Sequence, residues 1–219
     1  MNIGAKGSKE QLEELNLILS IAGLSFIEVK NTKNIDSHNF DIIFDLNFDA
    51  KPETMSDYEA IDDNTFLFVS AVKIQLEALK FSRPNLLIGI NALPTFLKRN
   101  ALEYCTMNEN FDASVILKLG WQEGFKVKSR VGMFSPRVVC MIINEAFYTL
   151  EEGTANKQDI DTGMKLGTSY PFGPFEWCEK IGIVNVYETL LALRNDNGDE
   201  RYKICSTLKT DYLKTITNV

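Results

Sequence analysis

This sequence of 219 residues has very little histidine and no closely spaced cysteine pair. It contains one histidine, His38, and four cysteines, at positions 105, 140, 178 and 205, with no C-x-x-C pair. Protein zinc sites need clustered cysteine and histidine ligands, so we expect no metal site. Scattered cysteines are instead typical of free thiols in a reducing compartment.

Excess basic charge and long apolar runs are also lacking. Lysine and arginine number 23 against 30 aspartate and glutamate residues, which gives a net charge of −7. Because this charge repels a phosphate backbone, nucleic acid is not an expected partner. No apolar run approaches the roughly 20 residues that cross a bilayer, and the N-terminus lacks the apolar core of a signal peptide. We therefore expect a cytoplasmic protein without membrane contacts.

The first 129 residues alternate short apolar segments with helical or loop segments. We expect strands near residues 25–29, 40–46, 66–69, 86–90, 102–105 and 125–128, after a first strand that ends near Gly4. Ser8 and Gln11 have the spacing of a capping box, which predicts a helix that Gly23 closes. A second helix is expected over residues 73–79. A strand, a glycine-flanked turn, a helix and a second strand are typical of the opening of a dinucleotide-binding domain.

The remainder of the chain is predicted to be helical. Ser135 followed by Pro136 predicts the start of a long helix that Gly153 ends. Further helices are expected from Asn156 to Gly167, from Pro174, after an Asn185–Glu188 capping box, and near residues 206–214. The long helix is apolar on nearly all sides between residues 138 and 143, so it needs cover on more than one side.

Five short motifs in this helical region resemble the C-terminal domain of the 3-hydroxyacyl-CoA dehydrogenases. They are NEA from Asn144, EEG from Glu151, DID from Asp159, MKLG from Met164 and YPFGPFE from Tyr170. The resemblance implies an α/β protein, with a reduced Rossmann-like, mostly parallel sheet in residues 1–129 and an all-α dimerisation domain in residues 130–219. It also implies NAD as cofactor, an acyl-CoA substrate and a homodimer formed through the helical domain.

The cofactor motif of this family is altered here. The family places Gly-x-Gly-x-x-Gly after the first strand, whereas this chain has a shortened turn with Gly4 and Gly7. The acidic residue that holds the adenosine ribose is replaced by Lys30, and an ammonium group accepts no hydrogen bond. Although Gly4, Gly7 and Lys30 are the cofactor-binding positions by resemblance, we expect NAD binding to be weak or absent.

The catalytic positions are altered as well. Arg83-Pro84 and Ile88-Gly89 match a family motif after which a catalytic histidine follows two residues later and its glutamate partner twelve beyond that. Here these two positions are Asn91 and Glu103. The family's catalytic serine corresponds to Ser70. Its substrate-binding asparagine corresponds to Pro136, which has neither a side-chain donor nor an N–H group.

Two functions follow from this pattern. The chain is either a 3-hydroxyacyl-CoA dehydrogenase-like oxidoreductase of fatty-acid metabolism that is impaired or inactive, or a non-catalytic homodimer that binds an acyl-CoA or a partner chain. A carboxamide does not act as a base near neutral pH, so Asn91 can only form hydrogen bonds. Glu103 and Ser70 can be explained as structural polar groups, and His38 as a solvated loop residue or a substitute base.

Overall fold

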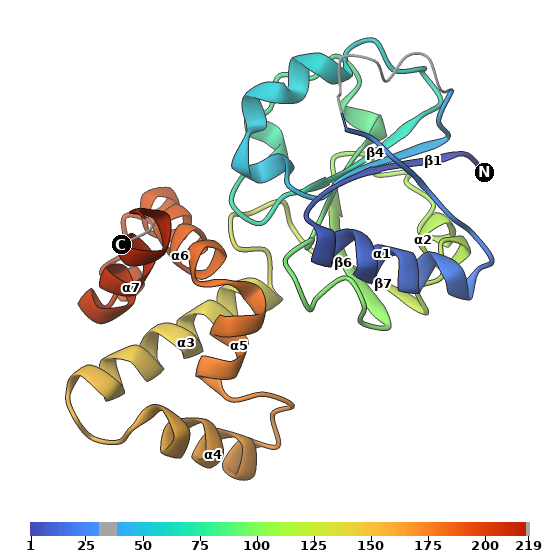
Figure 1. Cartoon of the computed structure of the whole chain (residues 1–219). Helices are drawn as coiled ribbons and strands as arrows, with labels where there is room; N and C mark the ends of the chain where they lie inside the picture. Colours follow the sequence, from blue (N-terminus) through green and yellow to red (C-terminus); the bar gives the residue numbers. More distant parts are fainter. Residues whose placement is uncertain (31–38, 218–219) are drawn as a thin grey trace. The chain divides into compact units, whose positions relative to one another are not determined.

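Among residues 1–30 and 39–217, which the computed structural model describes, seven strands form one sheet in the order β2-β1-β3-β4-β5-β6-β7 (Figure 1). Every neighbouring pair is parallel except β5 and β6, which are antiparallel. This confirms the predicted mostly parallel, Rossmann-like sheet. The strands are β1 (Ile3–Lys6), β2 (Ile27–Glu28), β3 (Ile42–Asp45), β4 (Phe66–Ser70), β5 (Leu87–Ile90), β6 (Ala101–Thr106) and β7 (Glu123–Lys126).

Both faces of the central strands are covered, as a parallel sheet requires. On one face, α1 (Lys9–Ile21) and α2 (Ser114–Lys118) pack against the sheet through a cluster of buried apolar side chains (Figure 1). On the other face lie short 3₁₀ segments, among them η3 (Pro52–Tyr58) and η4 (Leu76–Ala78). Tyr58 and Leu76 on these segments are fully buried.

The helix predicted over residues 73–79 is wrong, because only the 3₁₀ segment η4 forms there. The backbone N–H groups of Val72 and Lys73 donate to the Asp49 carboxylate, and that of Leu76 donates to Ser129 Oγ. In a helix that starts at Lys73, the Leu76 N–H would donate to the Val72 carbonyl. Here Ser129 takes that donor, and the Gly132 N–H occupies the Val72 carbonyl at 2.6 Å.

The turn after α2 packs directly against α1 at Gly120. Gly120 has φ of +111°, and an added Cβ would lie 2.2 Å from the carbonyl oxygen of Ile18. We therefore expect Gly120→Ala to lower the free energy of unfolding by roughly 3 kcal/mol. The matched control is Gly23→Ala, at φ of +69° with no atom within 4 Å of the added Cβ. Urea unfolding should show a loss of only about 1 kcal/mol for the control, and equal losses would contradict the prediction.

The chain divides into two units, Met1–Met133 and Phe134–Val219, and the second unit is helical. Its helices are α3 (Ser135–Glu151), α4 (Lys157–Thr168), α5 (Pro174–Ile181), α6 (Ile183–Asn197) and α7 (Ser206–Thr217), with the 3₁₀ segment η6 (Glu200–Tyr202) between the last two. The central helix α3 packs against α5, α6 and α7. No described helix has the length and apolar composition that a bilayer crossing needs.

Several predicted helix boundaries of this unit are confirmed. Asn156 accepts a hydrogen bond from the Asp159 N–H group, Pro174 is the first residue of α5, and Gly153 has φ of +71°. Three predictions are wrong by one or two residues. Ser135 lies inside α3 rather than capping it, α4 continues past Gly167, and α6 starts at Ile183 ahead of Asn185.

Candidate functional site

Asn91 and Glu103 lie side by side where the antiparallel strands β5 and β6 meet. The Asn91 backbone N–H donates to the Glu103 carbonyl at 3.1 Å, and Asn91 Nδ2 lies 3.5 Å from Glu103 Oε2. Both residues are buried, with 2% and 6% of their surfaces exposed. The two side chains are therefore in contact, although 3.5 Å is the long limit for a hydrogen bond.

An arginine lies near this pair. Burial lowers the pKa of Arg99, and the charges of Glu103 and Glu14 oppose that shift. The guanidinium carbon of Arg99 also lies 4.0 Å from the centre of the Phe96 ring. The Glu103 carboxylate therefore has a permanent cation in its electrostatic environment, whereas a histidine partner would change charge near neutral pH.

Ser70, at the end of β4, is bonded to a carboxylate that the sequence did not indicate. Its hydroxyl group donates to Asp49 Oδ2 at 2.8 Å, and the same oxygen accepts the Val72 N–H at 3.0 Å. Burial raises the pKa of Asp49, while the Lys73 charge and these hydrogen bonds act against the increase. The arrangement anchors the loop after β4 and directs the Ser70 hydroxyl hydrogen toward Asp49.

A second unpredicted cluster lies between the carboxyl ends of β1 and β3, where the strand order reverses. Lys6 Nζ lies 3.1 Å from Asp45 Oδ2, and the Tyr58 hydroxyl donates to the same oxygen at 2.7 Å. Asp45 is fully buried. Burial and the neighbouring Asp45 charge both raise the pKa of Tyr58, so the phenol stays protonated. In open α/β sheets this reversal point is where ligands bind, and here the chain's own side chains occupy it.

The turn from β1 into α1 is closed by side chains. A Cβ atom on Gly7 would lie 3.0 Å from the Leu46 Cβ. The prediction that Gly4 lies in this turn is wrong, because Gly4 is inside β1 and pairs with β2 and β3; a Cβ there would lie 3.0 Å from the Phe40 ring. The predicted capping box is confirmed: Ser8 N–H donates to Gln11 Oε1 at 2.8 Å, and Gln11 N–H donates to Ser8 Oγ. Both glycines are explained by close packing within the chain.

Three predicted positions remain, and each is described separately. Lys30 is exposed after β2, and His38 lies outside the described residues. Pro136 is buried in the first turn of α3, in the second unit. Among residues 1–30 and 39–217, no group of three or more metal-binding side chains is found.

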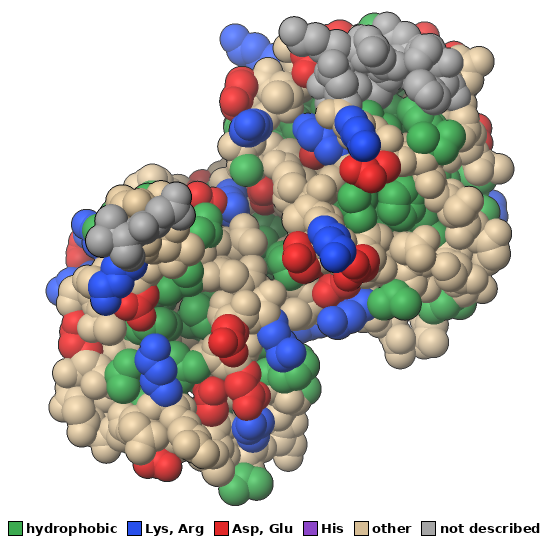
Figure 2. Space-filling view, viewed as in Figure 1, with side chains coloured by type: hydrophobic (Ala, Val, Ile, Leu, Met, Phe, Trp, Pro, Cys, Tyr) green, Lys and Arg blue, Asp and Glu red, His purple; other side chains and the backbone are tan. Residues whose placement is uncertain are grey.

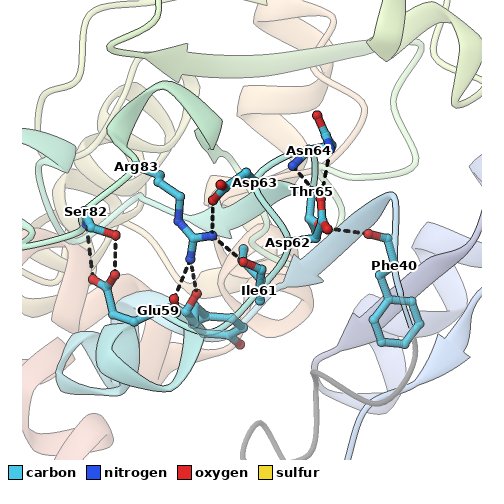
Figure 3. A network of polar contacts seen from close by, with 10 residues as sticks. Phe40, Glu59, Ile61, Asp62, Asp63, Asn64, Thr65, Ser82 and Arg83 are labelled. Atoms are coloured by element: carbon cyan, nitrogen blue, oxygen red, sulfur yellow. Dashed lines mark hydrogen bonds and ion pairs between the residues drawn. The ribbon is translucent and has the colours of Figure 1, made fainter.

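Arg83, from the matched Arg-Pro motif, has a structural role in the first unit. Figure 3 shows its guanidinium group directed at the turn after η3, where it donates to the Glu59 and Ile61 carbonyl groups and to the Asp63 carboxylate. Ser82 beside it donates to the Glu59 carboxylate. The motif therefore holds together two loops that precede β4 and β5.

Comparisons with known proteins agree with this architecture. Residues 132–214 match the model of the 3-hydroxyacyl-CoA dehydrogenase C-terminal domain. The 3-hydroxyadipyl-CoA dehydrogenase of Escherichia coli (strain K12) is 46% identical over 78 residues, which are 36% of this chain and 16% of that protein. The 3-hydroxybutyryl-CoA dehydrogenase of Bradyrhizobium diazoefficiens is 31% identical over 145 residues, which are 64% of this chain and 49% of that protein. The chain thus spans at most about half the length of these two relatives.

A solved structure covers nearly the whole chain. The (S)-3-hydroxybutyryl-CoA dehydrogenase of Ralstonia eutropha superposes with a TM-score of 0.74 over 95% of this chain and 92% of that one, at 19% identity. Residues 132–214 therefore match the 3-hydroxyacyl-CoA dehydrogenase family, and the chain as a whole is similar in fold to a member of it. The sequence match is strongest in the C-terminal domain, and the structural match extends the shared fold to the sheet.

The turn from β1 into α1 uses two of its N–H groups within the chain. A pyrophosphate binds at the N-terminus of the first helix through free N–H groups. Here the Ser8 and Gln11 N–H groups are taken by the capping box, and Leu46 and Gln11 fill the space next to Gly7. The Gln11 side chain is itself held by the carbonyl oxygens of Leu46 and Ala92, each at 2.7 Å.

The sequence did not reveal Asp49, Asp45 or Tyr58 as members of this site. Asp45 is the last residue of the apolar strand β3, and Asp49 follows four residues later. Nothing in the local sequence shows that either carboxylate is buried, because their burial depends on contacts with distant segments. Lys6 carried the one available signal, because a lysine stands at the end of β1, where the family's motif is rich in glycine.

Proposed function

We propose that this protein is a 3-hydroxyacyl-CoA dehydrogenase homologue of acyl-CoA metabolism in which the dehydrogenase step is impaired or lost. The observation that supports this proposal is the buried contact between Asn91 and Glu103, which the sequence motif aligns with the family's histidine and glutamate. Oxidation of a 3-hydroxyacyl-CoA requires a base that takes the hydroxyl proton, and an amide nitrogen does not do so near neutral pH.

The remaining polar groups do not supply an evident replacement. Asp49 is a carboxylate near Ser70, but its Oδ2 already accepts three hydrogen bonds, from Ser70, Val72 and Lys73. Glu103 lies next to the amide of Asn91.

The direct test is the rate of 3-hydroxybutyryl-CoA oxidation with NAD, for which we expect a value far below that of a competent dehydrogenase.

A second candidate function is a non-catalytic homodimer that binds an acyl-CoA or a partner chain through the helical unit. The observation that favours dimerisation is the open surface of α4. Only Asp161 on this helix is buried, and Leu166 is 82% exposed. Added Cβ atoms on Gly163 and Gly167 would meet nothing within 4 Å. In a helix that faces water, each glycine lowers the stability of the helix by about 1 kcal/mol. In a helix that packs on another helix, glycines allow the two backbones to approach closely, so their presence favours a helix–helix contact.

We expect Leu166→Glu to dissociate this dimer, because it would bury an unpaired charge in the contact. Sedimentation velocity at micromolar concentration should change from a dimer of the 24.8 kDa chain to a monomer. The control is Ile21→Glu on α1, which is 73% exposed and lies in the first unit. A wild-type monomer, or a dimer that tolerates Leu166→Glu, would exclude this assembly.

A further inference from the structure

Two buried side chains of α1 hold the β5–β6 loop, which consists of residues 91–100. Gln11 and Glu14 lie three positions apart on α1, so they share one face of the helix. Gln11 Nε2 donates to the Ala92 carbonyl oxygen at 2.7 Å. The Thr95 N–H group donates to the two Glu14 carboxylate oxygens, at 2.8 and 3.0 Å. Gln11 and Glu14 are only 4% and 8% exposed, so both contacts are shielded from water.

Thr95 has a backbone conformation that threonine rarely adopts. Its φ is +78°, in the left-handed region, where a β-branched residue is a genuine outlier. Its hydroxyl group is buried, and in the described part of the chain that group has no hydrogen-bond partner. Both features cost free energy, and such a residue persists only where the surrounding contacts hold it. The hydrogen bonds from the Thr95 N–H group to Glu14 are contacts of this kind.

Glu14 is well suited to hold the loop because it is paired with a cation. Figure 2 shows basic and acidic side chains side by side on the visible face, and Lys98 forms the same kind of pair with Glu14, at 3.2 Å from Nζ to Oε1. A hydrogen bond to an ionised carboxylate is about twice as strong as one between neutral groups. The Thr95 N–H group therefore has a strong acceptor that offsets the backbone strain.

The same loop determines the position of the Asn91 side chain. The Leu93 N–H group donates to Asn91 Oδ1 at 3.4 Å, while Asn91 Nδ2 lies 3.5 Å from Glu103 Oε2. The Asn91 N–H group donates to the Glu103 carbonyl oxygen at 3.1 Å. The contact with Leu93 requires the chain to turn directly after Asn91, and Gln11 holds the residue between them.

We propose that Gln11 and Glu14 are positioning residues that hold the β5–β6 loop against α1 in a strained conformation. By holding the loop, they fix the Asn91 side chain beside Glu103. Loss of either contact lets the strained backbone relax and moves Asn91 away from Glu103.

The proposal also connects this loop with the β1–α1 turn. Gln11 Oε1 accepts the Ser8 N–H group of that turn, so a ligand that displaces Gln11 from the turn would release the β5–β6 loop as well. The proposal rests on the proposed function only for the role of Asn91 and Glu103. Its test uses neither substrate nor cofactor, so a normal dehydrogenase rate would contradict the proposed function and leave this test unaffected.

Amide hydrogen exchange of the full chain, followed by NMR, tests the proposal. Glu14→Ala removes the acceptor for the Thr95 N–H group, and Gln11→Met removes the donor to the loop at similar side-chain size. In each variant we expect the Asn91 N–H group to exchange roughly 10-fold faster, and the signals of its side-chain amide to move. The N–H group of Phe68, which is fully buried in β4, should accelerate much less.

A matched control separates loss of the loop contacts from loss of stability. Leu15 is fully buried on α1 and belongs to the apolar core, so Leu15→Ala destabilises the unit and leaves both loop contacts in place. It should not accelerate exchange at Asn91 more than at Phe68. Glu14→Gln keeps an acceptor oxygen for the loop and should remain close to the wild-type protein.

Variants of Thr95 test the strain itself. Thr95→Gly and Thr95→Ala both remove the buried hydroxyl group, but only glycine adopts a positive φ freely. Combined with Glu14→Ala, Thr95→Gly should return the Asn91 exchange rate toward the wild-type value, and Thr95→Ala should not. If Glu14→Ala does not fold, the same combinations with Gln11→Met give the test.

Three results would overturn the proposal. The first is an unchanged Asn91 exchange rate in both Glu14→Ala and Gln11→Met. The second is an acceleration at Phe68 as large as that at Asn91 in these variants. The third is a rescue by Thr95→Ala that equals the rescue by Thr95→Gly, because the strained φ would then not be the cause.

Discussion

With 3-hydroxybutyryl-CoA and NAD, the purified protein is expected to turn over about 10²- to 10⁴-fold more slowly than a competent dehydrogenase, whose turnover is on the order of 10 s⁻¹. The reason is the loss of the general base, which corresponds to roughly 3 to 5 kcal/mol of barrier. Asn91 keeps the contact with Glu103 but accepts no proton. Fixed-time assays that measure NADH absorbance at high protein concentration can detect turnover in this range.

The variant Asn91→His restores an imidazole beside Glu103. We expect it to raise the turnover number only if the cofactor still binds. Asn100→His, an exposed position later in the same loop, is the matched control for an added histidine. Wild-type turnover near 10 s⁻¹ would show that another group has replaced the base.

The parts of the fold that local chemistry determines were predictable from the sequence. The Ser8–Gln11 capping box, the Asn156 cap and the start of α5 at Pro174 each depend on residues within a few positions of one another. The predicted helix over residues 73–79 failed for the opposite reason. Asp49 and Ser129 accept its N–H groups from more than twenty positions away, and no local pattern reports such a contact.

In the candidate site, too, the sequence indicated some contacts and not others. The contact between Asn91 and Glu103 was predictable, because the matched motif fixes both positions and the two strands are neighbours. The pairing of Lys6 with Asp45, and of Ser70 with Asp49, joins segments 39 and 21 residues apart. These pairs depend on how the loops at the carboxyl edge of the sheet pack, and the sequence alone did not indicate them.

Affinity for NADH is expected to be at least about 100-fold weaker than in a dehydrogenase with the intact motif. The shortened turn removes backbone donors to the pyrophosphate, and Lys30 replaces the acidic residue that accepts hydrogen bonds from the ribose. Each loss lowers the binding free energy by on the order of 1 to 3 kcal/mol. The packing adds a steric cost, because Leu46 and Gln11 lie in the space next to Gly7. Leu46→Ala should open that space without restoring the lost donors, so we expect little recovery of affinity.

The central claim is that this chain has a Rossmann-like sheet and yet binds NADH weakly or not at all, because its cofactor motif is altered. Isothermal titration calorimetry of NADH into the wild-type protein tests it most directly. We expect no saturable heat at NADH concentrations up to the millimolar range. A stoichiometric transition with a micromolar dissociation constant would contradict the account, because it would require the Ser8–Gln11 turn and Leu46 to move aside for the cofactor.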